Sequence, residues 1–186
     1  MTVNQAEIRD VSSRYLERNP DETEALQPLF RALDEGHAIT SRKEFRIGHV
    51  TVGAVVLDPA NRVLLIRHKI LDKWLLPGGH LEPVDGDLFH ASLRELEEET
   101  GITWQRASCP PAYDDMPADI DIHTIPASLS KGEPEHLHFD FRYVHRVERT
   151  DVHLQIEEVT DFEWRPLADL PAELARKLVP VVSSGN

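Results

Sequence analysis

The chain has 186 residues, and its 20 Lys and Arg against 33 Asp and Glu give a formal net charge of −13. Such an acidic surface repels phosphate backbones and anionic headgroups, so a nucleic-acid polymer and a polybasic membrane contact are both disfavoured as partners. With 40% hydrophobic and 28% charged residues, the composition is that of a soluble globular chain, and the length suits one domain with a sizeable core.

Cysteine content and the N-terminal residues bear on the compartment. Cys109 is the only cysteine, which excludes an internal disulfide and a cysteine-rich zinc site. The N-terminus lacks the basic start and the continuous apolar run of a signal peptide, and no stretch reaches the length of a membrane span. We therefore expect a soluble cytoplasmic protein.

Apolar residues at helical spacing predict two helices in the first 45 residues. The first pattern is Ile8, Val11 and Tyr15, and the second is Leu26, Leu29, Phe30 and Leu33. Pro28 removes a backbone donor, so the second helix is expected to be kinked or to restart there. We interpret residues 1–45 as an N-terminal helical extension that covers the sheet, forms a homodimer or closes over a substrate.

Strand-like runs alternate with turns from Gly48 onward. The predicted strands are His49–Leu57 and Arg62–His68, which form a hairpin, and then Asp119–Ile125, Glu135–Val147 and Asp161–Trp164. Two further helices are predicted, from Asp87 to Thr100 and from Leu170 to Val179. Since the chain has no regular βαβ repeat, we predict an α+β fold, with the main domain over residues 46–180 and a C-terminal tail over residues 181–186.

Three glutamates crowd onto one face of the helix that is predicted to begin after the N-cap Asp87 and to end at Gly101. Glu95, Glu98 and Glu99 are spaced i, i+3 and i+4 in the last turns, where the helix macrodipole already presents negative charge. Each unfavourable contact costs about 0.3–1 kcal/mol, so the arrangement calls for a cation. Hard oxygen ligands suit Mg²⁺ or Mn²⁺, and Mg²⁺ commonly shares its positions with substrate phosphates. A solvated acidic face is the alternative.

The sequence around this helix resembles the signature of the Nudix hydrolase family. That signature is Gly, five residues, Glu, seven residues and Arg-Glu-U-x-Glu-Glu-x-Gly-U, in which U is aliphatic. The run from Arg94 to Ile102 matches every specified position. Counting from Gly79, the first glutamate position falls on Asp85, and one residue is inserted around Gly86-Asp87. The resemblance therefore rests on Gly79–Ile102, with Asp85 in place of the first glutamate.

The resemblance implies an α/β/α sandwich around a mixed sheet. It also implies hydrolysis of a diphosphate linkage in a small nucleotide-like, phosphate-containing substrate by metal-activated water, with Mg²⁺ as cofactor and Mn²⁺ as a substitute. The implied metal ligands are the glutamates Glu95, Glu98 and Glu99 and the backbone carbonyl of Gly79.

The same resemblance suggests catalytic roles for residues around the metal. Arg94 is expected to orient the carboxylates, in contact with Asp85, Glu82 or Asp87. The base that activates water is expected to be Glu98, Glu99 or, on a loop before the last strand, Glu158. Because adjacent acids on a polar loop are often only solvated, a surface role is the alternative for Glu158.

Polar residues on one face of the strand Glu135–Val147 are further candidates. We predict that Arg142 and His138 contact the substrate, together with Arg67 at the end of the hairpin, although an ordinary exposed sheet face fits the same pattern. His136 and His138, with His123 on the preceding strand, could instead bind zinc.

Two other functions therefore stand beside the metal-dependent hydrolase. One is a catalytically weak Nudix-fold module that binds or senses a nucleotide, for which the inserted residue and Asp85 leave room. The other is a zinc hydrolase centred on His123, His136 and His138, which would be indifferent to the glutamates.

Overall fold

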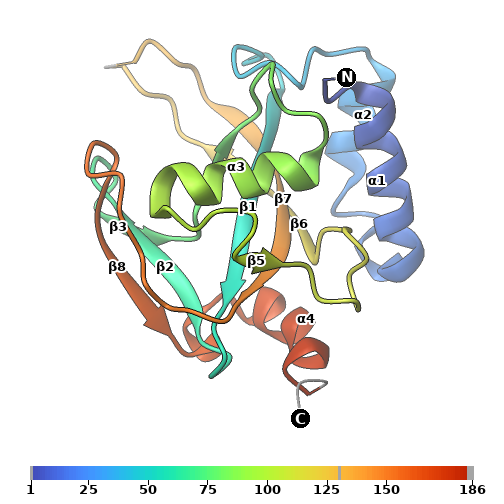
Figure 1. The fold of residues 1–186 in the computed structure, drawn as a ribbon. Helices are drawn as coiled ribbons and strands as arrows, with labels where there is room; N and C mark the ends of the chain where they lie inside the picture. The colour runs from blue at the N-terminus through green and yellow to red at the C-terminus, as the bar shows by residue number, and fades with distance from the viewer. Residues whose placement is uncertain (1, 130, 184–186) are drawn as a thin grey trace.

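One long buried strand organises the sheet in the computed structural model, which describes residues 2–129 and 131–183 (Figure 1). All ten residues of β1 (Gly48–Leu57) are buried, as its valine-rich sequence favours. This strand pairs in parallel with β7 (His136–Val147) and antiparallel with β2 (Val63–His68) and β4 (Gly78–His80). The sheet is therefore mixed, and the predicted hairpin of the first two strands is confirmed.

Short or peripheral strands complete the sheet on both sides of this centre. β3 (Lys73–Leu75) and β8 (Val159–Arg165) pair with β2. On the other side, β6 (Asp119–Ile125) and β5 (Ala107–Ser108) pair with β7. The three shortest strands, β3, β4 and β5, were not predicted from the sequence.

Helices cover both faces of the sheet. On one face of the sheet, Ala54 of β1 packs against Leu96 of α3 (Leu88–Thr100). The same face is covered by α1 (Gln5–Arg18) and α2 (Gln27–Asp34), which lie beside α3 in Figure 1. The next residue of β1, Val55, points the opposite way and packs against Leu174 of α4 (Ala172–Ser183). This arrangement is the α/β/α sandwich expected from the sequence.

The N-terminal helices cover the sheet, which is one of the three roles considered for them. Asn4 caps α1, and the side chains of Ile8 and Tyr15 are almost fully buried in the core. A 3-10 turn, η1 (Pro20–Glu22), separates α1 from α2. α2 begins at Gln27 with Pro28 in its first turn, so the predicted restart at this proline is confirmed.

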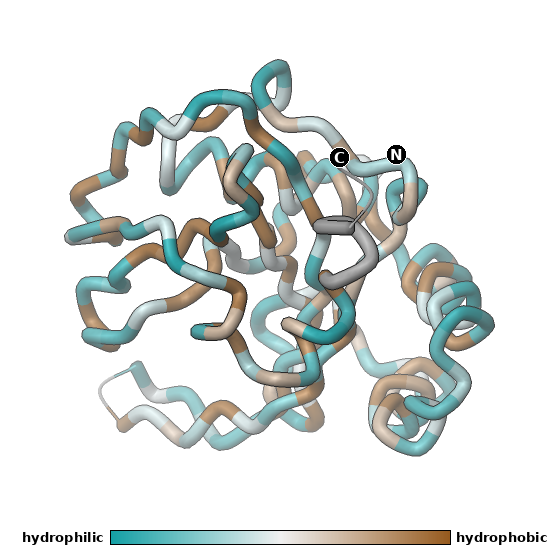
Figure 2. The backbone as a smooth tube through the Cα atoms, turned by 90° about the horizontal axis from the view of Figure 1, so that it is seen from below, coloured by the Kyte–Doolittle hydropathy of each residue, from teal (hydrophilic) through white to brown (hydrophobic). Residues whose placement is uncertain are grey.

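The C-terminal part of the fold runs through a second 3-10 turn, η2 (Leu167–Asp169), into α4. This helix extends to Ser183 and so enters the predicted tail, whose residues 184–186 lie outside the described part of the chain. The division of the chain at residues 45 and 180 stays a prediction. Among the described residues no helix is both long and apolar enough to cross a bilayer, and Figure 2 shows hydrophilic and hydrophobic residues interspersed along the elements.

A buried ion-pair network ties α4 to the N-terminal helices and to β6. The Nζ atom of Lys177, whose side chain is 9% exposed, lies 2.6 Å from Glu22 Oε1 and 2.5 Å from Asp119 Oδ1. It also donates a hydrogen bond of 2.7 Å to Tyr15 Oη. Lys177 therefore joins three segments that are far apart in the sequence.

We expect Lys177→Ala to lower the free energy of unfolding by about 1–3 kcal/mol, because it leaves the half-buried Glu22 without its cation and Asp119 with Arg142 alone. Urea denaturation measures this difference. Arg176→Ala, at an exposed neighbouring position, is the control and should stay within about 0.5 kcal/mol of the wild type. Equal stability of the two variants would show that the network contributes nothing to holding α4.

Candidate metal and active site

The helix α3 has the boundaries expected from its sequence. Asp87 is the N-cap, and its Oδ1 accepts a 2.8 Å hydrogen bond from the backbone N–H of His90. Gly101 ends the helix with a φ of 68°, in the left-handed region that favours glycine. The caps therefore fix which residues form the last two turns, where the three glutamates lie.

The backbone of β4 lies directly against two of these glutamates. The backbone N–H of Gly78 donates a 2.8 Å hydrogen bond to Glu99 Oε2. A Cβ atom at Gly79 would lie 2.7 Å from the carboxylate of Glu95, closer than real Cβ contacts allow. Only glycine lets the strand and the carboxylate approach so closely, which places the Gly79 backbone beside the predicted metal ligands.

Arg94 forms the framework of the site. Its guanidinium donates two hydrogen bonds to the carboxylate of Asp85, of 2.8 and 3.0 Å, and one of 2.9 Å to the backbone carbonyl of His80. Its Nη1 atom donates to Glu95 Oε1 at 3.0 Å and to Glu98 Oε2 at 2.9 Å. These contacts, first of all that with Asp85, raise the pKa of Arg94.

Asp85 is thus the partner of Arg94 among the three acids considered. The inserted residue and the shorter side chain do not prevent a two-pronged contact, and Asp85 is 4% exposed. Asp87 is engaged as the helix cap, and the backbone N–H of Glu82 donates a 2.7 Å hydrogen bond to Asp85 Oδ2. Asp85 Oδ2 therefore accepts hydrogen bonds from both Arg94 and the backbone of Glu82.

Burial makes two of the glutamates costly to ionise. Desolvation raises the pKa of Glu95 to about 7 and that of Glu99 to about 8, and the neighbouring acids add to both shifts. Glu98, with a side chain 53% exposed, lies at the open side. A desolvated pair of carboxylates beside a glycine backbone, with hard oxygen donors, fits a divalent cation such as Mg²⁺.

The three carboxylates do not converge on a single point. Glu95 and Glu98 both turn towards Arg94, whereas Glu99 turns towards the N–H of Gly78. A cation shared by all three would therefore require Glu98, the exposed member, to turn away from Arg94.

Glu158 lies on the segment that precedes β8, next to the C-terminal end of α3. The backbone N–H of Gln155 donates a 3.1 Å hydrogen bond to the carbonyl of Glu99, and that of Lys69 donates a 2.9 Å bond to the carbonyl of Glu158. The charge of Glu158 contributes to the raised pKa of Glu99. The predicted base is therefore exposed and close enough to influence the glutamate cluster.

A family model described as NUDIX domain matches residues 48–183. The chain belongs to this family. The match covers the whole sheet and α3 and α4, and it leaves α1 and α2 outside.

The curated relatives of this NUDIX domain are named as hydrolases. It is 30% identical over 94 residues to a probable DHNTP pyrophosphohydrolase of Lactococcus lactis subsp. cremoris, a match that covers 50% of this chain and 52% of that protein. It is 31% identical over 147 residues to the m7GpppN-mRNA hydrolase NUDT17 of Xenopus laevis, a match that covers 74% of this chain and 47% of that protein. The chain thus spans about half the length of the curated relatives it matches.

Solved structures share the fold at low sequence identity. The Ap4A hydrolase of C. elegans, in a binary complex, superposes with a TM-score of 0.56 and 22% identity over 73% of this chain and 98% of that one. The NUDIX domain of Shewanella oneidensis NrtR, complexed with ADP ribose, superposes with a TM-score of 0.51 and 22% identity, over 76% of this chain and 93% of that one. These likenesses confirm the Nudix-like fold predicted from the sequence.

Two of the predicted substrate contacts are arginines that already bind carboxylates in this NUDIX domain. The three guanidinium nitrogens of Arg142 lie 2.8–2.9 Å from Asp119, Asp121 and Asp140. Arg67 pairs with Asp72 at 2.7 Å. Either arginine would have to exchange a partner before it could bind a phosphate.

The histidines form a different group from the predicted zinc site. His138, the third predicted substrate contact, converges with His49 and His80, and one ligand nitrogen from each of the three rings lies within 4.8 Å of the others. His123 and His136 lie beside this group but outside it. Burial lowers the pKa of His138 to about 3 and that of His80 to about 4, so both are neutral at neutral pH.

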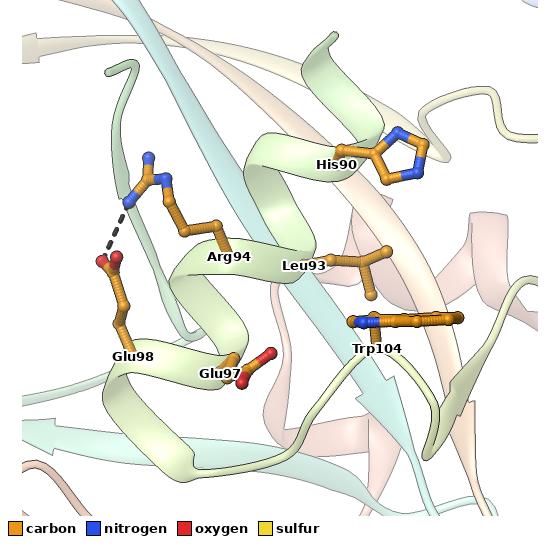
Figure 3. Close-up of a pocket in the computed structure, with 6 residues that line it drawn as sticks. All are labelled: His90, Leu93, Arg94, Glu97, Glu98 and Trp104. Atoms are coloured by element: carbon orange, nitrogen blue, oxygen red, sulfur yellow. Dashed lines mark hydrogen bonds and ion pairs between the residues drawn. The ribbon is translucent and has the colours of Figure 1, made fainter. Parts of the chain in front are cut away.

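A pocket on the outer side of α3 borders the glutamate cluster. It is lined by His90, Leu93, Arg94, Glu97, Glu98 and Trp104, and Figure 3 shows the Arg94–Glu98 ion pair on one side and the indole of Trp104 on the other. Trp104 is 61% exposed and was not singled out from the sequence, because a lone tryptophan after a helix carries no motif. The pocket contains neither Glu95 nor Glu99, so it lies beside the cluster.

Proposed function

We propose that this NUDIX domain hydrolyses a diphosphate linkage in a small nucleotide-like substrate, using Mg²⁺, for which Mn²⁺ can substitute. The observation that supports this proposal best is the pair of desolvated glutamates, Glu95 and Glu99, held against the glycine backbone of β4. A buried carboxylate pair beside a single arginine lacks positive charge, and a divalent cation supplies it.

In this proposal Glu95, Glu98, Glu99 and the carbonyl of Gly79 hold the cation. When bound, the cation acts as a Lewis acid that balances charge on the phosphate oxygens and lowers the pKa of the attacking water. Arg94 keeps the carboxylate of Glu95 in place, whereas Glu98, the exposed member, turns from Arg94 to the cation.

Asp85 supports this arrangement from behind, because it fixes the guanidinium of Arg94 through two hydrogen bonds. The carboxylate of Glu158 accepts the proton of the water, since it is exposed and close to Glu99; Glu98 is the alternative base. Arg67, Arg142 and His138 stay proposals as substrate contacts.

The experiment that tests the function is a substrate panel in H₂¹⁸O, with Mg²⁺ and with EDTA. The panel contains nucleoside triphosphates, ADP-ribose, dinucleoside polyphosphates and non-nucleotide diphosphates, and mass spectrometry identifies the products. We expect Mg²⁺-dependent cleavage with ¹⁸O on a phosphorus of one product. A protein that binds panel members but cleaves none would favour the regulatory module instead.

The pKa values of Glu95 and Glu99 predict how pH changes the affinity for the cation. Mg²⁺ or Mn²⁺ needs the deprotonated carboxylates. Protons increasingly occupy Glu99 below about pH 8 and Glu95 below about pH 7. The affinity for Mn²⁺ should therefore fall by at least about tenfold between pH 8 and pH 6. Calorimetry in buffers of different ionisation enthalpy measures both the affinity and the protons released. An affinity that is constant over this range would contradict the assignment of these two ligands.

A further inference from the structure

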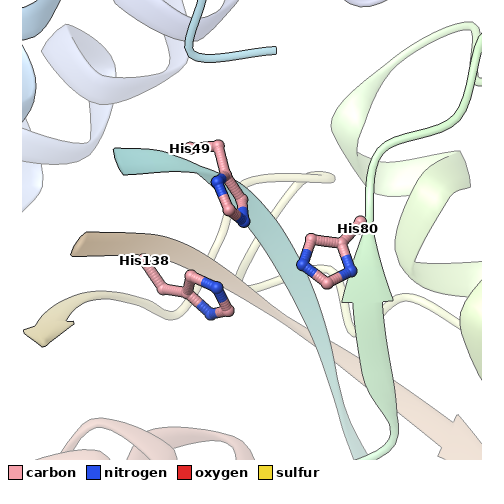
Figure 4. A group of neighbouring side chains, drawn as sticks. All are labelled: His49, His80 and His138. Carbon is pink, nitrogen blue, oxygen red and sulfur yellow. The ribbon is translucent and has the colours of Figure 1, made fainter. Parts of the chain in front are cut away.

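Three imidazoles from three strands meet on the face of the sheet that lies away from α3. His49 on β1 lies opposite His138 in the parallel pairing of β1 with β7, and His80 on β4 lies opposite Thr51, two residues further along β1. Residues in these register positions point to the same face of a sheet. Figure 4 shows the three rings turned towards one another.

This face is opposite to the one that carries the glutamates. A Cβ atom at Gly79 would point at Glu95 of α3, and His80, the next residue of β4, therefore points to the other face. The histidine group and the glutamate cluster are thus separated by the thickness of one strand. They are two distinct sets of donors, one of imidazole nitrogen and one of carboxylate oxygen.

The spacing of the three rings suits one small ion. One ligand nitrogen from each ring lies within 4.8 Å of the others, and the ring centroids are 4.8 to 5.5 Å apart. An ion between them would be at most about 2.8 Å from each nitrogen, against about 2.0–2.1 Å for a Zn–N bond. Small rotations of the rings close this difference.

His49 supplies a second, independent observation. This residue is 1% exposed, and its Nε2 atom has no hydrogen-bond partner, a rare condition for a buried polar atom. Its Nδ1 atom lies 3.3 Å from the backbone carbonyl of Glu44, so Nδ1 carries the proton and donates it there. A histidine held in this way through one nitrogen presents the lone pair of the other, as metal-binding histidines do.

We propose that His49, His80 and His138 bind a divalent transition metal of the zinc class, such as Zn²⁺, Co²⁺ or Ni²⁺. Neutral imidazole nitrogens favour these ions over Mg²⁺, which prefers oxygen. Three protein ligands leave a fourth position for water or a phosphate oxygen. The proposal does not depend on the hydrolase activity, since none of the three side chains belongs to the glutamate cluster.

A Co²⁺ titration in the presence of excess Mg²⁺ tests this site. Mg²⁺ occupies oxygen-ligand sites, and four-coordinate Co²⁺ bound to imidazoles gives strong visible absorption that six-coordinate Co²⁺ lacks. We expect one such Co²⁺ per chain in the wild type and at least a tenfold loss of affinity in His80→Gln and in His138→Gln. His123→Gln, whose ring lies next to that of His138 but outside the group, is the matched control and should bind as the wild type does.

Absence of the absorption in the wild type would overturn the proposal, as would unchanged affinity in both variants. Weaker Co²⁺ binding in His123→Gln alone would show that other histidines form the site, and it would overturn the assignment as well. Long-range ¹H–¹⁵N spectra of the wild type with Zn²⁺ give an answer that does not depend on the folding of any variant. The expected result is a shift of one ring nitrogen in each of His49, His80 and His138, and spectra unchanged by Zn²⁺ would contradict it.

Discussion

Glu99→Gln is expected to lower the Mg²⁺-dependent kcat of this NUDIX domain by at least about 100-fold. The substitution removes a buried anionic ligand while the amide oxygen still accepts the hydrogen bond from the N–H of Gly78. The fold should therefore be preserved, and the variant should be at least as stable as the wild type, because a desolvated carboxylate has been neutralised. Steady-state kinetics on the best substrate of the panel, with thermal unfolding in parallel, measure both effects.

Glu97→Gln is the matched control for this prediction. Glu97 lies on the same helix and undergoes the same chemical change, but it is exposed and has no contact with the other glutamates or with Arg94 among the described hydrogen bonds and ion pairs. Its kcat should stay within about twofold of the wild type. If Glu99→Gln retained the kcat of Glu97→Gln, Glu99 would have no part in the reaction.

Arg94→Ala is expected to abolish turnover and to lower the free energy of unfolding by about 3–5 kcal/mol. The side chain bridges Asp85, Glu95, Glu98 and the carbonyl of His80, so its loss leaves Asp85 as an unpaired charge that is 4% exposed. The stability loss and the activity loss have different causes, and they can be separated.

A double-mutant cycle with Asp85→Ala makes that separation. Removing Asp85 as well as Arg94 eliminates the unpaired buried charge, so the double variant should be more stable than Arg94→Ala, with a coupling energy of about 0.5–3 kcal/mol. Turnover should not return, because Glu95 still lacks its arginine. If the effects of the two substitutions on the free energy of unfolding were additive, the interaction between Arg94 and Asp85 would not stabilise this fold.

The parts of the site that were predictable from the sequence are those set by local geometry. The helix caps Asp87 and Gly101 define α3, and within a helix the spacing of Glu95, Glu98 and Glu99 fixes their common face. The same locality explains why the restart at Pro28 was predicted correctly.

Contacts between strands are the parts that the sequence did not reveal. The pairing of β4 with β1 brings His80 beside His49, yet β4 is a three-residue strand with two glycines and has little strand propensity. The parallel register of β7 with β1 adds His138. Each contact joins segments tens of residues apart, and single-residue patterns carry no information on such a register.

The environment of Arg142 illustrates the same limit for charges. The alternation of polar residues on β7 correctly indicated a polar face, but two of the carboxylates that surround this arginine come from β6. The alternation alone left Arg142 free to contact a phosphate, whereas the register of β6 with β7 supplies it with carboxylate partners. Charge pairing across strands therefore decides which basic groups stay available.

The central claim, that the glutamates of α3 hold the catalytic cation, is tested most directly by Mn²⁺ binding followed by electron paramagnetic resonance. Mn²⁺ prefers oxygen ligands, so the measurement reports on the carboxylates rather than on the imidazoles. The account predicts bound Mn²⁺ in the wild type and an affinity at least about tenfold weaker in Glu98→Gln and in Glu99→Gln. Wild-type affinity in both variants would contradict it.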